Sequence, residues 1–223
     1  MFAGVADRYD RANRILSMGV DVRWRKAAVA FAGVGAGEEA LDVCAGTGDL
    51  TCALRDAGAR VVGSDFCPEM LAHAVDKWPH AERPRYVAGD TLKLPFRDDS
   101  FDLATVAFGI RNVEDPTAGI RELARVVRPG GRVVVLEFCR PRVPLFRSAY
   151  MLYFRRILPR LGSWITGDRA GAYEYLPDSV MAFPEREQFL ELMRDAGLVA
   201  PKMKVLTGGI AALYRGEVEE RTN

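Results

Sequence analysis

The sequence predicts a doubly wound α/β fold, in which helices cover both faces of a seven-stranded, mostly parallel sheet with a C-terminal antiparallel hairpin strand. Short apolar runs alternate with longer segments of helical periodicity, which is the pattern of βαβ units. The first run leads through two glycines into a helix, and the last two runs are joined by a Gly-Gly turn. The length of 223 residues fits a single domain, residues 1–223.

The first 31 residues precede the sheet and show helical periodicity before and after Asp21, so we expect two helices. One interpretation is a cap that only packs on one face of the sheet. The other is an N-terminal lid, residues 1–31, that closes a pocket. Tyr9 and Asp10 favour the lid, because they place a phenol and a carboxylate beside an apolar stripe.

A glycine turn follows the first predicted strand and organises the predicted pocket. The strand contains Asp42, and the turn contains Gly46 and Gly48. Glycine lets a ligand lie against the backbone, and the helix that follows presents unpaired N–H groups. A pyrophosphate-binding turn would have glycine in place of Thr51 and would not be crowded by acids. The turn therefore favours S-adenosylmethionine, which carries sulfonium and ammonium groups, over NAD.

The next two strands, predicted at 60–64 and 85–88, each lead to an acidic residue. Asp65 lies 19 positions beyond Gly46, close to the spacing at which an acid meets a ribose, although it could instead be a charge at a helix N-terminus. Asp90 and Thr91 reach the same edge of the sheet, where they could bind an adenine. The alternative for Asp90 is an exposed loop acid.

The central strand, predicted at 101–108, ends in a segment that brings Arg111 and Asn112 to the same edge. Their side chains could hold an oxygen of a substrate. The alternative is a surface arginine paired with Glu114 or Asp115. Further helices are predicted at 50–57, 68–78, 117–127 and 185–196, a turn at 128–131, and further strands at 133–138, 199–206 and 210–215.

Residues 140–183 interrupt the alternation with a basic, aromatic helical insertion. Between Arg140 and Arg169 there are seven arginines and one acid, Asp168, interleaved with apolar and aromatic residues at helical spacing. This pattern suits a substrate or membrane interface. A packed insertion with a solvated arginine face is the alternative, and a nucleic-acid groove is disfavoured because no stacking platform is visible.

The composition excludes several classes of function. The formal net charge is +1, which argues against a nucleic-acid binder. Four cysteines without a CxxC pair and only two histidines predict neither a disulfide framework nor a metal site. We expect no signal peptide, and the sequence contains no apolar run of membrane-spanning length. We expect a cytoplasmic protein that takes no metal and associates peripherally with the inner face of the cell membrane.

Together these segments resemble the ubiquinone/menaquinone biosynthesis C-methyltransferase family, within the class I, Rossmann-like S-adenosylmethionine-dependent methyltransferases. The resemblance covers essentially the whole chain. The glycine turn is shared by many methyltransferases, whereas other segments are more particular. The segments that carry the resemblance are 5–10 (VADRYD), 41–49 (LDVCAGTGD), 94–96 (LPF), 100–102 (SFD), 108–113 (FGIRNV), 128–132 (RPGGR), 136–138 (LEF) and 173–180 (YEYLPDSV).

The resemblance implies S-adenosylmethionine as cofactor and a prenylated quinol as methyl acceptor. It places Thr47, Asp65, Asp90 and Thr91 at cofactor-binding positions, and we expect Asp42, Gly46 and Gly48 to form the same pocket. We hypothesise that Arg111 stabilises a phenolate, oriented by Asn112 and Tyr9.

Ala107 and Cys139 stand where ubiquinone-type relatives commonly have serine, which favours demethylmenaquinol over a benzoquinol. Two alternatives stay open: a methyltransferase of another lipid-like substrate, such as a sterol or phospholipid headgroup, and a catalytically silent cofactor-binding scaffold. The sequence leaves a homodimer possible.

Overall fold

The computed structural model describes residues 6–77, 84–166 and 172–220, with the side chains of all but residues 6–9, 172 and 174. Its strands are β1 (Glu39–Val43), β2 (Arg60–Asp65), β3 (Arg85–Ala88), β4 (Phe101–Ala107), β5 (Val127–Phe138), β6 (Leu198–Leu206) and β7 (Ala211–Val218). Its α-helices are α1 (Ala6–Leu16), α2 (Val20–Ala32), α3 (Asp49–Asp56), α4 (Pro68–Asp76), α5 (Pro116–Val126), α6 (Pro144–Leu152), α7 (Leu158–Thr166), α8 (Ala172–Ala182) and α9 (Glu187–Asp195). The described ranges also contain three short helical segments: the 3-10 turns η2 (Ile110–Asn112) and η4 (Thr207–Gly209), and the π-helical segment η3 (Tyr153–Ile157).

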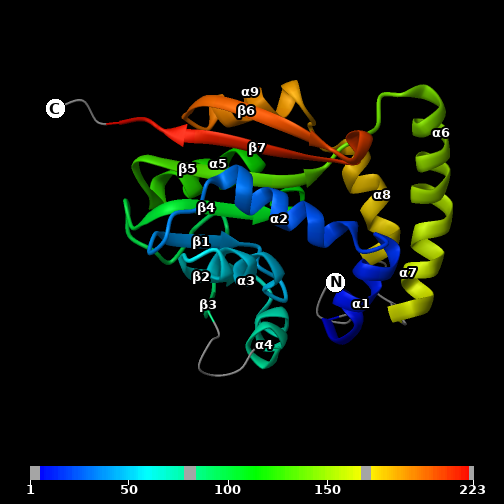
Figure 1. Cartoon of the computed structure of the whole chain (residues 1–223), viewed down its shortest axis with the longest axis horizontal. Helices are drawn as coiled ribbons and strands as arrows, with labels where there is room; N and C mark the ends of the chain where they lie inside the picture. Colours follow the sequence, from blue (N-terminus) through cyan, green and yellow to red (C-terminus); the bar gives the residue numbers. More distant parts are fainter. Residues whose placement is uncertain (1–5, 78–83, 167–171, 221–223) are drawn as a thin grey trace.

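The strands of the described ranges form one seven-stranded sheet in the order β3-β2-β1-β4-β5-β7-β6 (Figure 1). The strands β1 to β5 pair in parallel, whereas β7 is antiparallel to both β5 and β6. The predicted fold class is therefore confirmed. The antiparallel strand β7 is second from the edge, because the hairpin folds so that β6 forms the outer strand.

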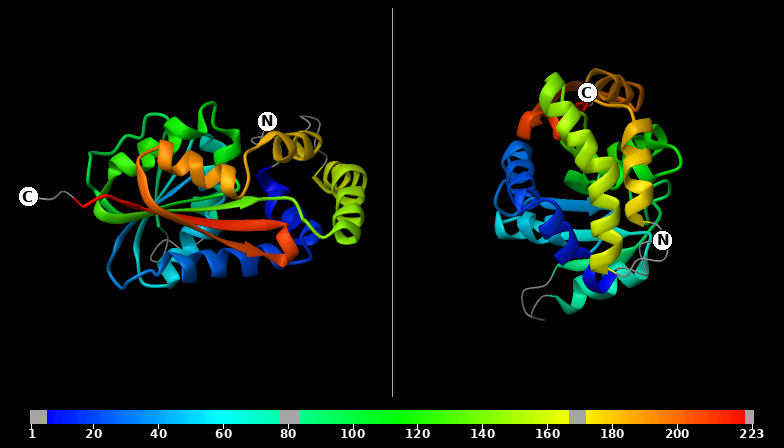
Figure 2. Two further views of the ribbon diagram at one scale, coloured as in Figure 1. Left: turned by 90° about the horizontal axis from the view of Figure 1, so that it is seen from above. Right: turned by 90° about the vertical axis from the view of Figure 1, so that its right-hand side faces the viewer.

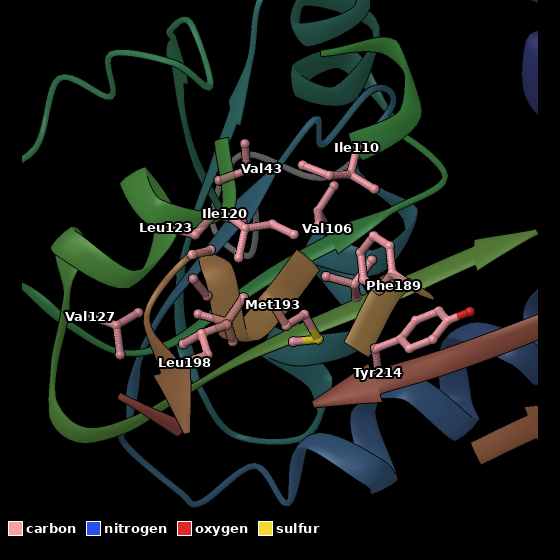
Figure 3. Close-up of a cluster of buried hydrophobic side chains, with 14 of the residues drawn as sticks. Val43, Val106, Ile110, Ile120, Leu123, Val127, Phe189, Met193, Leu198 and Tyr214 are labelled. Atoms are coloured by element: carbon pink, nitrogen blue, oxygen red, sulfur yellow. The ribbon is translucent and has the colours of Figure 1, made fainter. Parts of the chain in front are cut away.

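Helices cover both faces of this sheet. Figure 2 shows α5 and α9 on one side and α2 on the other. The α5 and α9 face holds a fully buried cluster that includes Ile120, Leu123, Phe189 and Met193 (Figure 3). Helix α5 begins at a side-chain cap: Asp115 accepts a hydrogen bond from the Ala118 N–H at 2.9 Å. These packed faces hold the strand ends in fixed positions.

The insertion after β5 forms a helical layer at the carboxyl end of the sheet. Helix α6, η3 and α7 form one continuous rod, seen at the right of Figure 1. The rod packs against α1 and α8 through a small separate core, whose members are Ala12, Leu16, Phe154, Leu158, Tyr173 and Val180. A π-helical segment inside a helix is often found at functional sites. None of the described helices is long and apolar enough to cross a membrane.

The main difference from the predicted elements is the start of β5. The sequence predicts a turn at 128–131 and a strand from Val133, but β5 already pairs with β4 from Val127, with a register shift between Phe101 and Leu103. Gly131 makes this possible, because a Cβ there would lie 2.8 Å from the Asp102 carbonyl oxygen. The proline and glycines therefore form an irregular strand entry, not a separate turn.

Candidate active site

A cavity of about 770 Å³ lies at the carboxyl ends of β1, β2 and β4, bounded by α1, α2 and the α6–α8 layer. Eight of the predicted site residues line it: Asp42, Gly46, Thr47, Asp65, Asp90, Thr91, Arg111 and Asn112. Gly48 is not among the lining residues, and the side chain of Tyr9 lies outside the described part of the chain. The topology thus brings together residues that are up to 70 positions apart, from Asp42 to Asn112.

The cavity has two chemically different ends. One end, around the glycine turn, is acidic and contains Asp21, Asp42, Asp49, Asp65 and Asp90. The other end is lined mainly by aromatic side chains, including Trp24, Phe108, Phe138, Tyr150, Phe154 and Tyr173. Arg111 lines the cavity close to the aromatic end, with its guanidinium carbon 5.4 Å from the Phe138 ring centroid.

The glycine turn has the backbone conformation that the sequence predicts. Gly46 and Gly48 have φ angles of 56° and 81°, which favour glycine. Gly48 caps α3, and a Cβ there would collide with the Tyr86 hydroxyl. Gly48 therefore shapes the turn from behind the cavity, whereas Gly46 and Thr47 face it.

Asp42 lies beneath the turn and is only 1% exposed. Its two carboxylate oxygens accept hydrogen bonds from the hydroxyls of Thr51 at 2.6 Å and Thr105 at 2.8 Å. Burial raises the pKa of Asp42 to about 6, although both hydroxyls oppose that shift. Thr51 thus has a structural task at the position where a dinucleotide-binding turn has glycine: it donates to the buried acid.

Asp65 lies at the end of β2, next to the glycine turn. Its carboxylate accepts hydrogen bonds from the backbone N–H groups of Gly46 and Cys67, both at 2.8 Å. Burial raises the pKa of Asp65, and these N–H groups oppose the shift. Each oxygen keeps an acceptor position beyond its backbone bond, so the carboxylate can still meet ribose hydroxyls.

Asp90 and Thr91 form the third part of the acidic end. Asp90 is exposed and accepts a hydrogen bond from the Leu92 N–H at 2.9 Å, which orders the loop. Thr91 is buried, with its hydroxyl 3.5 Å from the thiol of Cys44. Both residues line the cavity.

Ion pairs hold α1 against the glycine turn. Asp10 accepts a hydrogen bond from the Thr47 hydroxyl at 2.5 Å and pairs with Lys77 of the α4 C-terminus at 2.7 Å. Asp49, the first residue of α3, pairs with the same lysine and lies 3.4 Å from Arg14. Burial alone would raise the pKa of Asp49, but the surrounding cations outweigh it and lower the pKa.

Arg111 is held by a buried acid that the sequence analysis did not single out. Its Nη1 lies 2.8 Å from Glu137 Oε1 and also donates to the Phe108 carbonyl oxygen. The side chains of Arg111 and Glu137 are only 6% and 1% exposed. Burial raises the pKa of Glu137, although Arg111 opposes that shift. The alternative pairing with Glu114 or Asp115 is not found.

The signal for Glu137 was present in the sequence: it is the one acid within the apolar run 133–138. An acid in a buried strand needs a partner, and Arg111 is that partner. Cys139 does not line the cavity: it is 1% exposed and donates to the Gly209 carbonyl oxygen at 3.0 Å. Only Ala107 of the two serine replacements lies where it can face a substrate.

Aromatic rings close the other end of the cavity. Phe108 and Phe138 lie with ring centroids 4.4 Å apart, and Tyr150 stacks on Phe154 at 5.3 Å. The indole of Trp24 donates to the Thr207 hydroxyl at 2.7 Å, which joins α2 to η4. This end offers contact area for a large planar or apolar group.

These residues fit S-adenosylmethionine. The glycine turn leaves open backbone at Gly46, and Asp65, Asp90 and Thr91 suit ribose and adenine. The acids near the turn suit the positive charges of the cofactor. No group of acidic, histidine and cysteine side chains within the described residues could hold a metal ion. Fold and site together define a class I S-adenosylmethionine-dependent methyltransferase.

Comparison with known proteins specifies the class further. The model of the ubiE/COQ5 methyltransferase family matches residues 1–217, and the chain belongs to this family. Demethylmenaquinone methyltransferase of Deinococcus radiodurans is 47% identical over 97% of this chain and 90% of that protein. The enzyme of the same name from Thermus thermophilus is 46% identical over 97% and 99%. The ubiquinone/menaquinone biosynthesis C-methyltransferase UbiE of Bdellovibrio bacteriovorus is 45% identical over 98% and 94%.

Solved structures share the fold at low sequence identity. A possible histamine N-methyltransferase from Thermotoga maritima superposes with a TM-score of 0.70 at 18% identity, covering 97% of both chains. Phosphoethanolamine N-methyltransferase 2 of Haemonchus contortus, solved with S-adenosyl-L-methionine, has a TM-score of 0.63 at 15% identity and covers 97% of this chain and 60% of that one. These likenesses support the fold alone.

Proposed function

We propose that this chain transfers a methyl group from S-adenosylmethionine to a ring carbon of demethylmenaquinol, a prenylated naphthoquinol, in isoprenoid quinone biosynthesis. The observation that carries the proposal is the two-ended cavity, in which an acidic end meets an aromatic end beside Arg111. The names of the relatives agree with this substrate. Alanine at position 107, in contact with the cavity, favours the naphthoquinol over the equivalent benzoquinol of the ubiquinone pathway.

The chemistry needs a ring carbon that is electron-rich. The carbon becomes so when a neighbouring hydroxyl gives its proton to a water in the site, and a fixed cation stabilises the phenolate that forms. Arg111 supplies that cation, since a guanidinium stays protonated. Glu137 and the Phe108 carbonyl both bind Nη1, so the rest of the guanidinium is fixed in orientation. Asn112, exposed at the cavity wall, orients the oxygen or a water beside it.

When bound, S-adenosylmethionine supplies the electrophilic methyl group. The transfer cancels opposite charges, so a site without bulk water favours it. We propose that residues 1–31 act as the lid that excludes water. The contacts of Asp10 with Thr47 and Lys77 support this role, because they fasten α1 directly over the glycine turn.

We propose that the rod of α6, η3 and α7 contacts the membrane that contains the substrate. Its outward face exposes large apolar side chains, with Leu145 84% and Trp164 82% exposed. Arg155 and Arg156 are exposed on the same rod. Apolar groups that enter the interface and arginines that meet anionic headgroups favour a bilayer surface. Tyr150 of the rod also lines the aromatic end of the cavity, which gives a prenyl tail a short route inward.

Vesicle sedimentation tests the membrane contact. Binding to anionic vesicles should weaken as salt rises, and Arg155→Glu with Arg156→Glu should weaken it at least about tenfold, at about 1 kcal/mol per arginine. Arg23→Glu with Lys26→Glu, at two exposed positions of α2, makes the same change in net charge and should leave binding unchanged. Equal vesicle binding by the wild-type protein and the Arg155/Arg156 double variant would remove the membrane contact from the proposal.

Mass spectrometry of reaction products tests the methyl transfer. The purified protein, given S-adenosylmethionine and reduced demethylmenaquinone, should add one methyl group to the ring. Arg111→Lys keeps a cation beside Glu137 but loses the planar fork, so kcat should fall about 100-fold. Binding of S-adenosylhomocysteine should stay unchanged in this variant.

Two other results would favour the alternatives. Methylation of a sterol or phospholipid headgroup that does not depend on Arg111 would indicate another lipid substrate. Cofactor binding without turnover on any reduced quinone would indicate a scaffold.

A further inference from the structure

The acidic end of the cavity poses a problem for one part of the cofactor. S-adenosylmethionine carries a carboxylate besides its sulfonium and ammonium groups, and a carboxylate among acids is repelled. Among the described residues that line the cavity, the acids are Asp21, Asp42, Asp49, Asp65, Asp90 and Glu114, and the cations are Arg25 and Arg111. Two cationic side chains are therefore candidates to bind the carboxylate.

Arg111 is the less suitable of the two. Its guanidinium lies 5.4 Å from the Phe138 ring and pairs with Glu137, so it belongs to the aromatic end. Arg25 lies at the acidic end. Its Nη1 is 3.7 Å from Asp49, the residue that directly follows the glycine turn.

The order of the other subsites also favours Arg25 as the residue that binds the carboxylate. Asp90 and Thr91 suit the adenine, and Asp65, bonded to the Gly46 N–H, suits the ribose. The amino-acid part of the cofactor must then extend past Gly46, toward the start of α3 and the facing side of α2. Arg25 is the cation on that side that reaches the cavity.

Arg25 also has a suitable edge available. Both of its ion pairs, to Asp21 at 2.6 Å and to Asp49 at 3.7 Å, use Nη1. Within the described residues, Nε and Nη2 make no hydrogen bond. These two nitrogens form the planar fork that binds a carboxylate through two parallel hydrogen bonds. The side chain is 15% exposed and fixed by Asp21, so the fork is preoriented.

We infer that Arg25 binds the carboxylate of S-adenosylmethionine through its Nε and Nη2 edge, with Asp49 beside it as the partner of the ammonium group. Arg25 would thereby distinguish the complete cofactor from adenosine compounds that lack the amino-acid part. This inference rests on the methyltransferase class and is independent of which quinol is methylated.

Calorimetric titration with two ligands tests the inference. S-adenosylhomocysteine carries the carboxylate, whereas 5′-methylthioadenosine has the same nucleoside without the amino-acid part. Arg25→Gln should raise the Kd of S-adenosylhomocysteine about 10- to 100-fold, the range for lost charge-assisted hydrogen bonds. The Kd of 5′-methylthioadenosine should change less than about threefold. Arg23→Gln, which removes the same charge from an exposed position of α2, should change neither.

A second variant covers a failure of Arg25→Gln to fold. Arg25→Lys keeps the charge next to Asp21 but loses the fork, so it should weaken S-adenosylhomocysteine alone, about three- to tenfold. Equal weakening of both ligands, or an unchanged Kd for S-adenosylhomocysteine, would overturn the inference. A wild-type protein that binds S-adenosylhomocysteine yet methylates no quinol would refute the proposed substrate and leave the role of Arg25 intact.

Discussion

The buried pair of Arg111 and Glu137 makes a quantitative prediction about stability. Arg111→Met leaves the Glu137 carboxylate 1% exposed and without its cation, and Glu137→Leu leaves the guanidinium without its acid. Removing one partner of such a pair costs about 3–5 kcal/mol. Replacing both partners by apolar side chains of similar size is often close to neutral. The double variant should therefore be more stable than either single variant.

Urea unfolding of the wild-type protein, the two single variants and the double variant measures this difference in stability as a double-mutant cycle. We expect a coupling free energy of at least about 3 kcal/mol between the two positions, far above the ~0.5 kcal/mol scatter of independent sites. In a domain of this size, each kcal/mol shifts Tm by about 2–4 °C, so the single variants should melt about 6–20 °C lower. Both should still fold, because a domain has about 5–15 kcal/mol in total.

The pH dependence provides an internal check. Burial raises the pKa of Glu137, and without Arg111 the pKa should rise further. The cost of Arg111→Met should therefore shrink as the pH falls and the carboxylate protonates. Single variants that each cost under about 1 kcal/mol, with additive effects at every pH, would refute the buried ion pair.

Three further perturbations test other parts of the site. Burial raises the pKa of Asp42 from 3.8 to about 6, so its stabilising contribution is fully present below pH 3.8 and lost as the pH rises through about 6. Asp42→Asn should accordingly raise the free energy of unfolding by up to about 3 kcal/mol at pH 8 and by less than about 1 kcal/mol near pH 4, as measured by urea unfolding. Gly48→Ala should cost about 1–3 kcal/mol, because of its φ of 81° and the Tyr86 hydroxyl, and Tyr86→Phe should recover part of that loss in the same assay. Lys77→Met removes the cation shared by Asp10 and Asp49, so limited proteolysis within α1 should become at least about threefold faster; an unchanged rate would contradict the fastening of α1.

Most of the fold follows from local patterns in the sequence. Parallel strands read as short apolar runs because both of their faces are buried, and the proline after Asp115 marks the start of α5. The carboxyl ends of parallel strands meet at one edge, which is why Asp65, Asp90 and Arg111 could be assigned to one site from their order alone.

The features that the sequence did not predict depend on contacts between segments far apart in the chain, and residue spacing does not encode such contacts. Arg111 has acids three and four positions away, yet it pairs with Glu137, because η2 turns the side chain toward the neighbouring strand β5. Gly48 looks like a ligand-facing glycine, and only the position of Tyr86 on β3 shows that it faces the protein. The early start of β5 has the same origin: its first residue pairs with Phe101 of β4 despite the Pro-Gly-Gly segment.

The charges of the site explain how one cavity serves a cationic donor and an anionic acceptor. An isolated guanidinium in the same cavity would repel a sulfonium, because like charges interact more strongly at the low effective dielectric constant of a protein site than in water. Glu137 lies 2.8 Å from Arg111 Nη1, so its negative charge cancels most of the electric field of the guanidinium at longer distances. A phenolate in direct contact with the guanidinium would still feel its N–H groups. In the proposed mechanism, the buried acid would let Arg111 act on the acceptor at short range without repelling the donor.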